Sequence, residues 1–249
     1  MSRIPLILTF ATVLIFGGLF YQYHAQKQDE QKLQAYQEVL LDKTEQILTA
    51  ARYVDTPIQV DTADSRLSGE YQVMASFVLN QMIETAEARN RYIRDLKALN
   101  WDHFLDIERL SRDKKQQYAE TEKMLKDVHA VVDAYAEQTK EMEKHSLEQA
   151  KHLAVSGRYS HQLAQSLRDS QKNDDAHALF ELEQQSLAKA DQIFEVLKKN
   201  RWEKKNKLFM FYEDAPLKQF NALYKEMLVL NRQMKQVSHA NREELENSL

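Results

Sequence analysis

The stretch that decides the fold runs from Tyr118 to Leu153 and reads YAETEKMLKDVHAVVDAYAEQTKEMEKHSLEQAKHL. Residues that can be buried recur in it every seven positions, in two interleaved series. The first series is Tyr118, Leu125, Val132, Thr139, Ser146 and Leu153, and the second is Thr121, Val128, Tyr135, Met142 and Gln149. Heptad spacing over about five repeats is typical of long helices that pack along their length. The sequence therefore predicts a helix over 113–155 whose packing seam becomes more polar toward Ser146.

Helical periodicity also fills most of the remaining chain. Apolar stripes at helical spacing predict helices up to about residue 54, over 71–99, over 160–172, over 176–197 and from Asp214 onward. The polar loop 55–69, a break at 100–102 and Gly157 separate them. We therefore predict an all-α fold in which residues 22–249 form a single elongated domain, an antiparallel helical bundle with heptad-like seams. An intermolecular coiled coil is the alternative, so the sequence leaves the oligomeric state open.

The composition excludes several classes of protein. The 249 residues include only four glycines, three prolines and no cysteine. Loops that bind phosphates or dinucleotides need several glycines at fixed spacing. No such pattern of glycines occurs in this sequence. Without cysteine there is no disulfide, thiolate nucleophile or zinc ribbon. The net charge of −4 gives no general reason to expect a nucleic acid partner.

An apolar segment lies close to the N-terminus, over residues 4–21, after a short tail formed by residues 1–3. Its 18 uncharged residues, IPLILTFATVLIFGGLFY, suit a single transmembrane helix. A cleaved signal peptide is the rival, but the expected small-x-small cleavage site is missing. We predict an uncleaved signal-anchor of a single-pass protein in the bacterial inner membrane. The cytoplasmic orientation of the N-terminus, with the domain in the periplasm, is favoured over the reverse.

No residue pattern indicates an enzyme. Glu141, His145, Glu148 and His152 lie along one side of the long predicted helix. Carboxylate-bridged di-metal bundles use two E-x-x-H repeats, and the chain contains none. H-E-x-x-H and G-x-S-x-G are also absent. We therefore predict no catalytic residue, no cofactor and no metal, and read these four residues as a solvated face.

One cluster stands out from the mixed-charge background, between residues 198 and 207. It consists of Lys198, Lys199, Arg201, Trp202, Lys204, Lys205 and Lys207, and the apolar run 208–212 follows it directly. Basic residues interleaved with aromatics can contact an anionic surface such as lipid head groups or an anionic polymer. The plainer interpretation is a connection between two helices, with solvated lysines and with aromatics turned into the bundle. The sequence favours the plainer interpretation.

The start of the last predicted helix resembles a known group of proteins. Phe211-Tyr212, Pro216-Leu217 and the run FNAL at 220–223 are similar to the final helix of all-helical bacterial envelope lipoproteins of unknown function. The resemblance covers about twenty residues, and the lipid-bearing cysteine of such proteins is absent here. It implies an envelope location and carries no functional residue to this chain.

Two hypotheses for function follow from the sequence. The first is a non-enzymatic, membrane-anchored helical envelope protein that acts through protein contacts, as scaffold, adaptor or accessory subunit with a partner of unknown identity. The second is a module that senses a ligand or binds an anionic surface. A ligand pocket would first be sought at Tyr118, Tyr135, Thr139, Ser146 and Gln149 of the seam.

Overall fold

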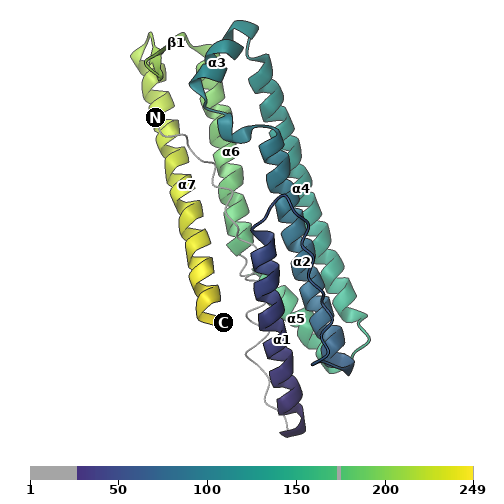
Figure 1. Ribbon diagram of the computed structural model, residues 1–249. Helices are drawn as coiled ribbons and strands as arrows, with labels where there is room; N and C mark the ends of the chain where they lie inside the picture. The colour runs from purple at the N-terminus through teal and green to yellow at the C-terminus, as the bar shows by residue number, and fades with distance from the viewer. Residues whose placement is uncertain (1–26, 173–174, 249) are drawn as a thin grey trace. The chain divides into compact units, whose positions relative to one another are not determined.

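The computed structural model describes residues 27–172 and 175–248, with side chains described for 31–169 and 177–237. This part of the chain is almost entirely helical (Figure 1), which confirms the prediction of an all-α fold class. The helices are α1 (Lys27–Ala51), α2 (Gly69–Ala98), α3 (Ile107–Asp113), α4 (Ala119–Lys151), α5 (Gly157–Lys172), α6 (Asp175–Lys199) and α7 (Asp214–Ser248). Two short 3-10 turns, η2 (Trp101–His103) and η3 (Lys114–Gln116), flank α3, and a hairpin of β1 (Trp202–Lys205) and β2 (Leu208–Phe211) joins α6 to α7.

The chain divides into two compact units, to both of which the long helices α2 and α4 contribute. Of the described residues, unit 1 comprises 93–134 and 177–239. Unit 2 comprises 27–92, 135–172, 175–176 and 240–248. The region predicted as a single domain thus contains two packing centres, each assembled from segments that are distant in the sequence.

In unit 2, α1 and α2 run in the same direction (Figure 1). Tyr36 near the start of α1 lies against Tyr71 near the start of α2, with ring centroids 5.6 Å apart. Asn90, toward the end of α2, donates a hydrogen bond to the carbonyl of Ala51, the last residue of α1, at 3.2 Å. The prediction of an antiparallel bundle is therefore wrong for this pair. The apolar pattern indicates which face of a helix is buried, but not in which direction its neighbour runs.

The parallel pair requires a long return connection, residues 52–68, which side chains of α2 hold in place. The Gln72 side chain accepts a hydrogen bond from the backbone N–H of Asp64 at 3.1 Å, and the Glu87 carboxylate accepts one from Ile58 at 2.5 Å. Gly69 then begins α2 with a φ of 59°, in the left-handed region that favours glycine. The predicted polar loop over 55–69 thus falls in this connection, and these hydrogen bonds tie it to α2.

The core of unit 2 combines an apolar cluster with a short polar ladder between α2 and α4. The apolar part includes Val39, Leu40, Ile47, Ala75, Val78, Leu79, Leu163 and Leu167. In the ladder, the Gln81 amide donates to Gln149 Oε1 at 3.0 Å. Ser146 Oγ reaches both Gln81 Oε1 and the carbonyl of Met142, the latter at 2.7 Å. The polar part of the predicted seam is therefore buried and satisfied internally at Ser146.

Unit 1 is organised around apolar and aromatic side chains from α3, α4, α6 and α7 and from the segments that flank α3. They include Phe104, Leu110, Tyr118, Leu125, Val128, Ile193, Phe194, Leu197, Phe220 and Met227, all buried. At its edge, Asp106 caps α3 by accepting hydrogen bonds from the backbone of Glu108 and Arg109, at 2.8 and 3.0 Å. These backbone donors hold the pKa of Asp106 below its ordinary value.

Asp113 caps α4 from a distance. Its buried carboxylate accepts from the backbone N–H groups of Glu120 and Thr121, at 3.0 and 2.8 Å, and from the Thr121 hydroxyl. Arg109 donates to the same hydroxyl at 2.9 Å and to the carbonyl of Phe104 at 2.6 Å. The sequence correctly marks Asp113 as a capping residue, but η3 intervenes, so the helix begins at Ala119 rather than at Asp113.

Of two other predicted helix boundaries, one agrees with the structure and one does not. The last helix begins at Asp214 as expected, whereas Gly157 opens α5 instead of ending the long helix, which stops at Lys151. The region predicted as a plain helix connection, by contrast, contains the hairpin β1–β2. Its residues alternate between two faces of a sheet and are not all turned into the bundle.

The predicted membrane anchor, residues 4–21, lies outside the described residues, as does the tail before it. Among the residues that the structure does describe, no helix is both long and apolar enough to cross a membrane.

Candidate docking surface

The hairpin in unit 1 has a tight turn and two distinct faces. Trp202 pairs with Phe211 and Lys205 with Leu208 in an antiparallel register. Asn206 and Lys207 form the two-residue turn with φ of 50° and 62°. Positive φ at both positions matches the right-handed twist of a hairpin, as in type I′ turns. Because side chains alternate along each strand, the strands present an inner face (Trp202, Lys204, Phe209 and Phe211) and an outer face (Arg201, Glu203, Lys205, Leu208, Met210 and Tyr212).

Trp202 anchors the inner face in the core. Its side chain is 2% exposed, and its indole N–H lies 2.8 Å from the Tyr118 hydroxyl and 3.1 Å from the carbonyl of Leu197. The Phe209 ring packs against Trp202 at a centroid distance of 5.0 Å. Burial raises the pKa of Tyr118, so this hydroxyl stays protonated and donates to Leu197. The hairpin is thus bonded to Tyr118, directly before α4, and to Leu197 of α6.

A lysine also contacts the Trp202 ring. Lys114 of η3 places its ammonium 4.7 Å from the ring centroid and donates to the carbonyl of Trp202. Desolvation, aided by the neighbouring charge of Arg201, lowers the pKa of Lys114. A cation held over an aromatic face and bonded to a carbonyl stabilises the strand position.

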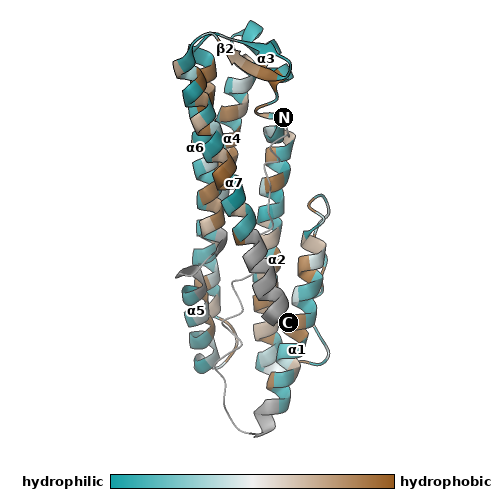
Figure 2. Cartoon of the chain, turned by 90° about the vertical axis from the view of Figure 1, so that its left-hand side faces the viewer, coloured by the Kyte–Doolittle hydropathy of each residue, from teal (hydrophilic) through white to brown (hydrophobic). Residues whose placement is uncertain are grey.

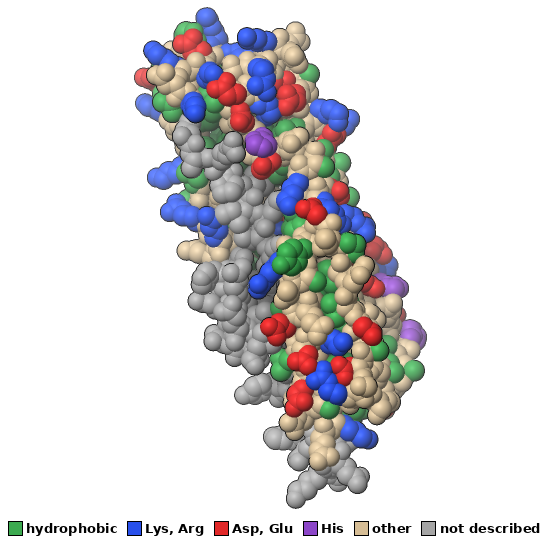
Figure 3. All heavy atoms as spheres, viewed as in Figure 1, with side chains coloured by type: hydrophobic (Ala, Val, Ile, Leu, Met, Phe, Trp, Pro, Cys, Tyr) green, Lys and Arg blue, Asp and Glu red, His purple; other side chains and the backbone are tan. Residues whose placement is uncertain are grey.

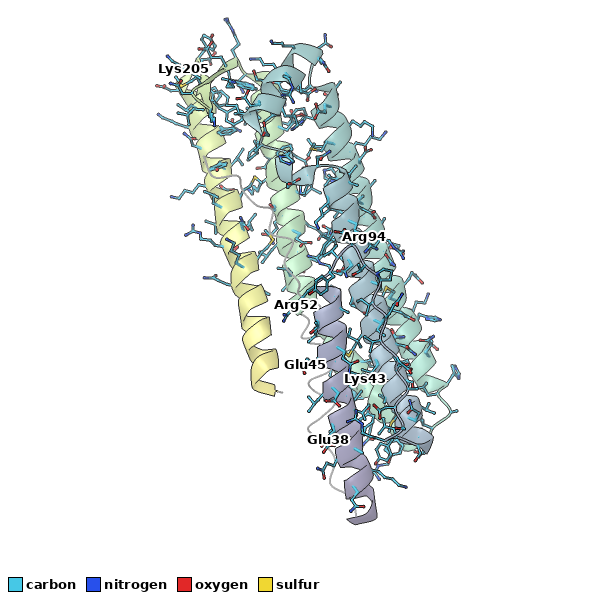
Figure 4. The ribbon with its side chains drawn as sticks, in the orientation of Figure 1. Glu38, Lys43, Glu45, Arg52, Arg94 and Lys205 are labelled. Atoms are coloured by element: carbon cyan, nitrogen blue, oxygen red, sulfur yellow. The ribbon has the colours of Figure 1, made fainter. Side chains whose placement is uncertain are left out.

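The structure separates the basic residues of the predicted site into two groups. Three of them are engaged with acidic side chains. These pairs are Lys198 with Glu122, Lys199 with Glu195 and Lys204 with Glu108. Lys205 and Lys207 form no ion pair with any residue whose side chain is described. The positive charge of this cluster that has no described acidic partner is therefore concentrated at the turn, and Figure 4 labels Lys205 there.

Arg201, on the outer face, belongs to neither group, because its guanidinium contacts an aromatic ring. It lies over the Tyr212 ring, 5.0 Å from the centroid, and the Tyr212 hydroxyl donates to Glu203 at 3.1 Å. This arrangement fixes an aromatic ring in an exposed position with its polar end bonded. The charge of Arg201 stays on the outer face, partly offset by Glu203.

Exposed apolar side chains gather on the same face. Leu208, Met210 and Tyr212 are 48%, 41% and 61% exposed, and they are three of the five large hydrophobic residues with high exposure in the described part of the chain. Figure 2 shows β2 as a hydrophobic strand, and Figure 3 shows Lys and Arg side chains, with Asp and Glu among them, at the end of unit 1 that carries it. We call Arg201, Lys205, Lys207, Leu208, Met210 and Tyr212 together the docking surface. Glu203, whose carboxylate accepts from the Tyr212 hydroxyl, lies among them on the outer face.

The polar residues that the sequence suggested for a ligand pocket are occupied by internal contacts. Tyr118 bonds to Leu197, and Thr139 Oγ1 donates to the carbonyl of Tyr135 at 2.9 Å. The Tyr135 ring stacks on Tyr92 at 4.4 Å. Ser146 and Gln149 belong to the polar ladder of unit 2. These contacts hold the packed helices together. No described polar group of this set is left directed at a ligand.

The row of Glu141, His145, Glu148 and His152 lies on the exposed side of α4, where Lys151 pairs with Glu148 at 2.6 Å. Within the described ranges, no three His, Asp or Glu side chains come together as metal ligands would. The structure therefore brings no residues of this row into a site.

Sequence reasoning missed the exposed half of the docking surface. The sequence favours a run LFMFY at 208–212 whose aromatic residues turn into the bundle, with contact to an anionic surface as the alternative. Strand alternation instead buries Phe209 and exposes Leu208 and Met210. The sequence does contain a signal for the hairpin. Two four-residue runs, 202–205 and 208–211, are separated by the two residues Asn206 and Lys207, which is the spacing of a hairpin turn.

Comparison with known proteins adds no assignment. No protein-family model, no curated protein and no solved structure matches this chain. The resemblance of residues 211–223 to envelope lipoproteins stays a prediction.

Proposed function

We propose that this chain is a non-enzymatic, membrane-anchored helical protein of the cell envelope that works by binding, as scaffold, adaptor or accessory subunit. The segment 4–21 supplies the anchor in this proposal, and the domain lies in the periplasm. The docking surface on the β-hairpin is the part that meets the partner.

The observation that carries the proposal is the gathering of exposed apolar side chains on one face of a rigidly held hairpin. Isolated exposed hydrophobic residues are normal on a protein surface, whereas neighbouring ones mark interaction sites. Leu208, Met210 and Tyr212 are neighbours on one sheet face, and Trp202 fixes the other face in the core. A preorganised surface of this kind loses little conformational entropy on binding.

The seam gives a second reason to prefer contact at the docking surface over a ligand pocket between the helices. Its polar groups stabilise the packing of α2, α4 and α6, so a ligand would have to displace existing hydrogen bonds. No specific contact favours a ligand in the seam, and the docking surface remains the better supported site.

Site-specific photo-crosslinking tests the proposal. A benzophenone amino acid replaces Met210 in the full chain, and membranes of expressing cells are irradiated. Val229, an exposed apolar residue of α7, receives the same probe as the matched control. We expect a light-dependent adduct, with protein or with lipid, from position 210 and not from position 229. Absence of any adduct at position 210 would overturn the proposal.

A further inference from the structure

Taking the docking surface as the functional one, as proposed above, we infer that its partner is the head-group layer of an anionic phospholipid bilayer. Lys205 and Lys207 meet the phosphates, and Leu208, Met210 and Tyr212 enter the boundary between head groups and acyl chains. This inference rests on the proposed function and names the chemistry of its partner.

Charge at the turn points to an anionic partner. Three lysines of the cluster are already paired within the protein. Of the two that remain, Lys205 precedes the turn and Lys207 forms it together with Asn206. Residues 203–208 are all exposed, so the ammonium groups of Lys205 and Lys207 are open to solvent at the turn. Basic groups near a bilayer surface are attracted by anionic lipids, and the attraction falls as salt rises.

The apolar side chains of the docking surface suit a bilayer interface. Leu208 and Met210 are flexible aliphatic chains next to the charged turn, and Tyr212 combines an apolar ring with a polar end. Tyrosine is enriched at the level of lipid head groups for this reason. Lysine stems can lie along apolar surface while their ammonium groups stay in water. Four-residue strands reach only a shallow depth, so the hairpin binds at the interface and does not cross the membrane.

Two alternative partners fit this surface less well. The core of a protein interface is depleted of lysine, whereas two lysines border Leu208 here. Single-stranded nucleic acid is held by bases stacked on exposed aromatic rings. Trp202 and Phe209 are buried, and the Tyr212 ring is already covered on one side by Arg201, so the hairpin offers no row of free rings.

A local fluorescence probe tests the inference on the full chain. Bulk binding to vesicles cannot serve, because the apolar segment 4–21 can bind any bilayer. The chain contains no cysteine, so Met210→Cys provides a single site for an environment-sensitive dye, and Val229→Cys provides the matched control. The labelled proteins are mixed with vesicles of phosphatidylcholine alone or of phosphatidylcholine with phosphatidylglycerol.

We expect a blue shift of emission at position 210 only with phosphatidylglycerol present, and quenching there by lipids that carry a quencher near the head group. Added salt or the pair Lys205→Gln and Lys207→Gln removes most of the shift, while circular dichroism is unchanged. Position 229 shows no shift. A dye at position 210 that stays in water with both vesicle types overturns the lipid inference.

The crosslinking experiment separates the two levels of failure. If the dye at position 210 reports no lipid but the benzophenone at that position captures a protein, the docking surface stands and its lipid partner is wrong. If neither experiment gives a signal, both the inference and the proposed function fail.

Discussion

The two halves of the α4 seam share one heptad spacing and are built from different chemistry. In unit 1, Leu125, Val128 and Val132 are buried among apolar side chains, and Thr121 is the polar exception. In unit 2, Ser146 and Gln149 take equivalent positions and meet Gln81 of α2. Heptad spacing therefore indicates which side of a helix packs, whereas the residue types decide whether apolar burial or hydrogen bonding holds it.

This difference predicts unequal sensitivity to substitution. Apolar burial loses both contacts and cavity volume when a side chain is shortened. A hydrogen-bond ladder contributes less, since one intramolecular hydrogen bond adds only about 1 kcal/mol net. Because the two units need not unfold together, hydrogen exchange along α4 is the measurement that assigns each effect to its half.

The largest effect is expected for Trp202→Ala in unit 1. Loss of the buried indole removes its packing on Phe209 and leaves Tyr118 with one partner fewer, at a cost of about 3–5 kcal/mol. Urea unfolding and faster hydrogen exchange in residues 119–134 would report it. Met210→Ala, on the outer face of the same hairpin, is the control. A loss for Trp202→Ala as small as for the control would show that the inner face is not part of the core.

The next largest effect is expected for Asp113→Ala. The substitution leaves the backbone N–H groups of Glu120 and Thr121 without an acceptor and removes the carboxylate beside Arg109, at a cost of about 3 kcal/mol. Hydrogen exchange should accelerate first at the start of α4. Asp133→Ala, on the exposed side of α4, should change little, and equal effects of the two substitutions would contradict the distant cap.

The ladder of unit 2 should respond more weakly. Ser146→Ala leaves Gln81 Oε1 without its buried donor and is expected to cost about 1 kcal/mol. Adding Gln81→Leu removes both partners and should recover most of the loss. A double-mutant cycle followed by urea unfolding measures this coupling. Strictly additive losses would mean that the ladder does not act as a unit.

A pH-dependent effect is expected at the cap of α3. The pKa of Asp106 is lowered in the folded state, so its contribution is complete above the pKa of the unfolded chain, roughly 4. It is lost as the pH falls through the lower folded value. Asp106→Asn keeps a good capping side chain without a titrating group. The stability difference between the two proteins should therefore shrink on acidification, and a constant difference would refute the assignment.

The smallest effect is expected on the docking surface. Leu208→Ser and Met210→Ser should alter the free energy of unfolding by no more than about 0.5 kcal/mol, because both side chains are largely in water. Thermal unfolding measures this change. A marked loss for either variant would show that the outer face contributes to the core and is unavailable for a partner.

The sequence predicted the helical class, the loop 55–69, the break at Asn100 and the start of the last helix, because each depends on local residue preferences. It also predicted the buried side of α4, which depends on periodicity alone. The relative direction of two packed helices, by contrast, does not follow from the sequence. Nothing in a stripe of apolar residues distinguishes parallel from antiparallel packing, so the pairing of α1 with α2 was missed.

The candidate site was located by composition and resolved only by the structure. Basic and aromatic residues marked the region 198–212, but the residues that pair with its lysines lie far away in sequence. Glu108 and Glu122, for example, belong to α3 and α4. The hairpin escaped notice because Lys207 stands where glycine is usual in such turns. Which lysines remain uncompensated is therefore a tertiary property.

The parallel arrangement of α1 and α2 has a consequence for how unit 2 folds. Thr44 meets Met82 across 38 residues of chain, and Ala51 meets Asn90 across 39, so the sequence separation stays constant along the pair. In two antiparallel helices the separation shrinks toward the connecting turn, and pairing can start there and propagate. Here every contact must first close a long loop, with its entropic cost. We therefore expect α1 to dock onto α2 later than helices that pair across a short turn.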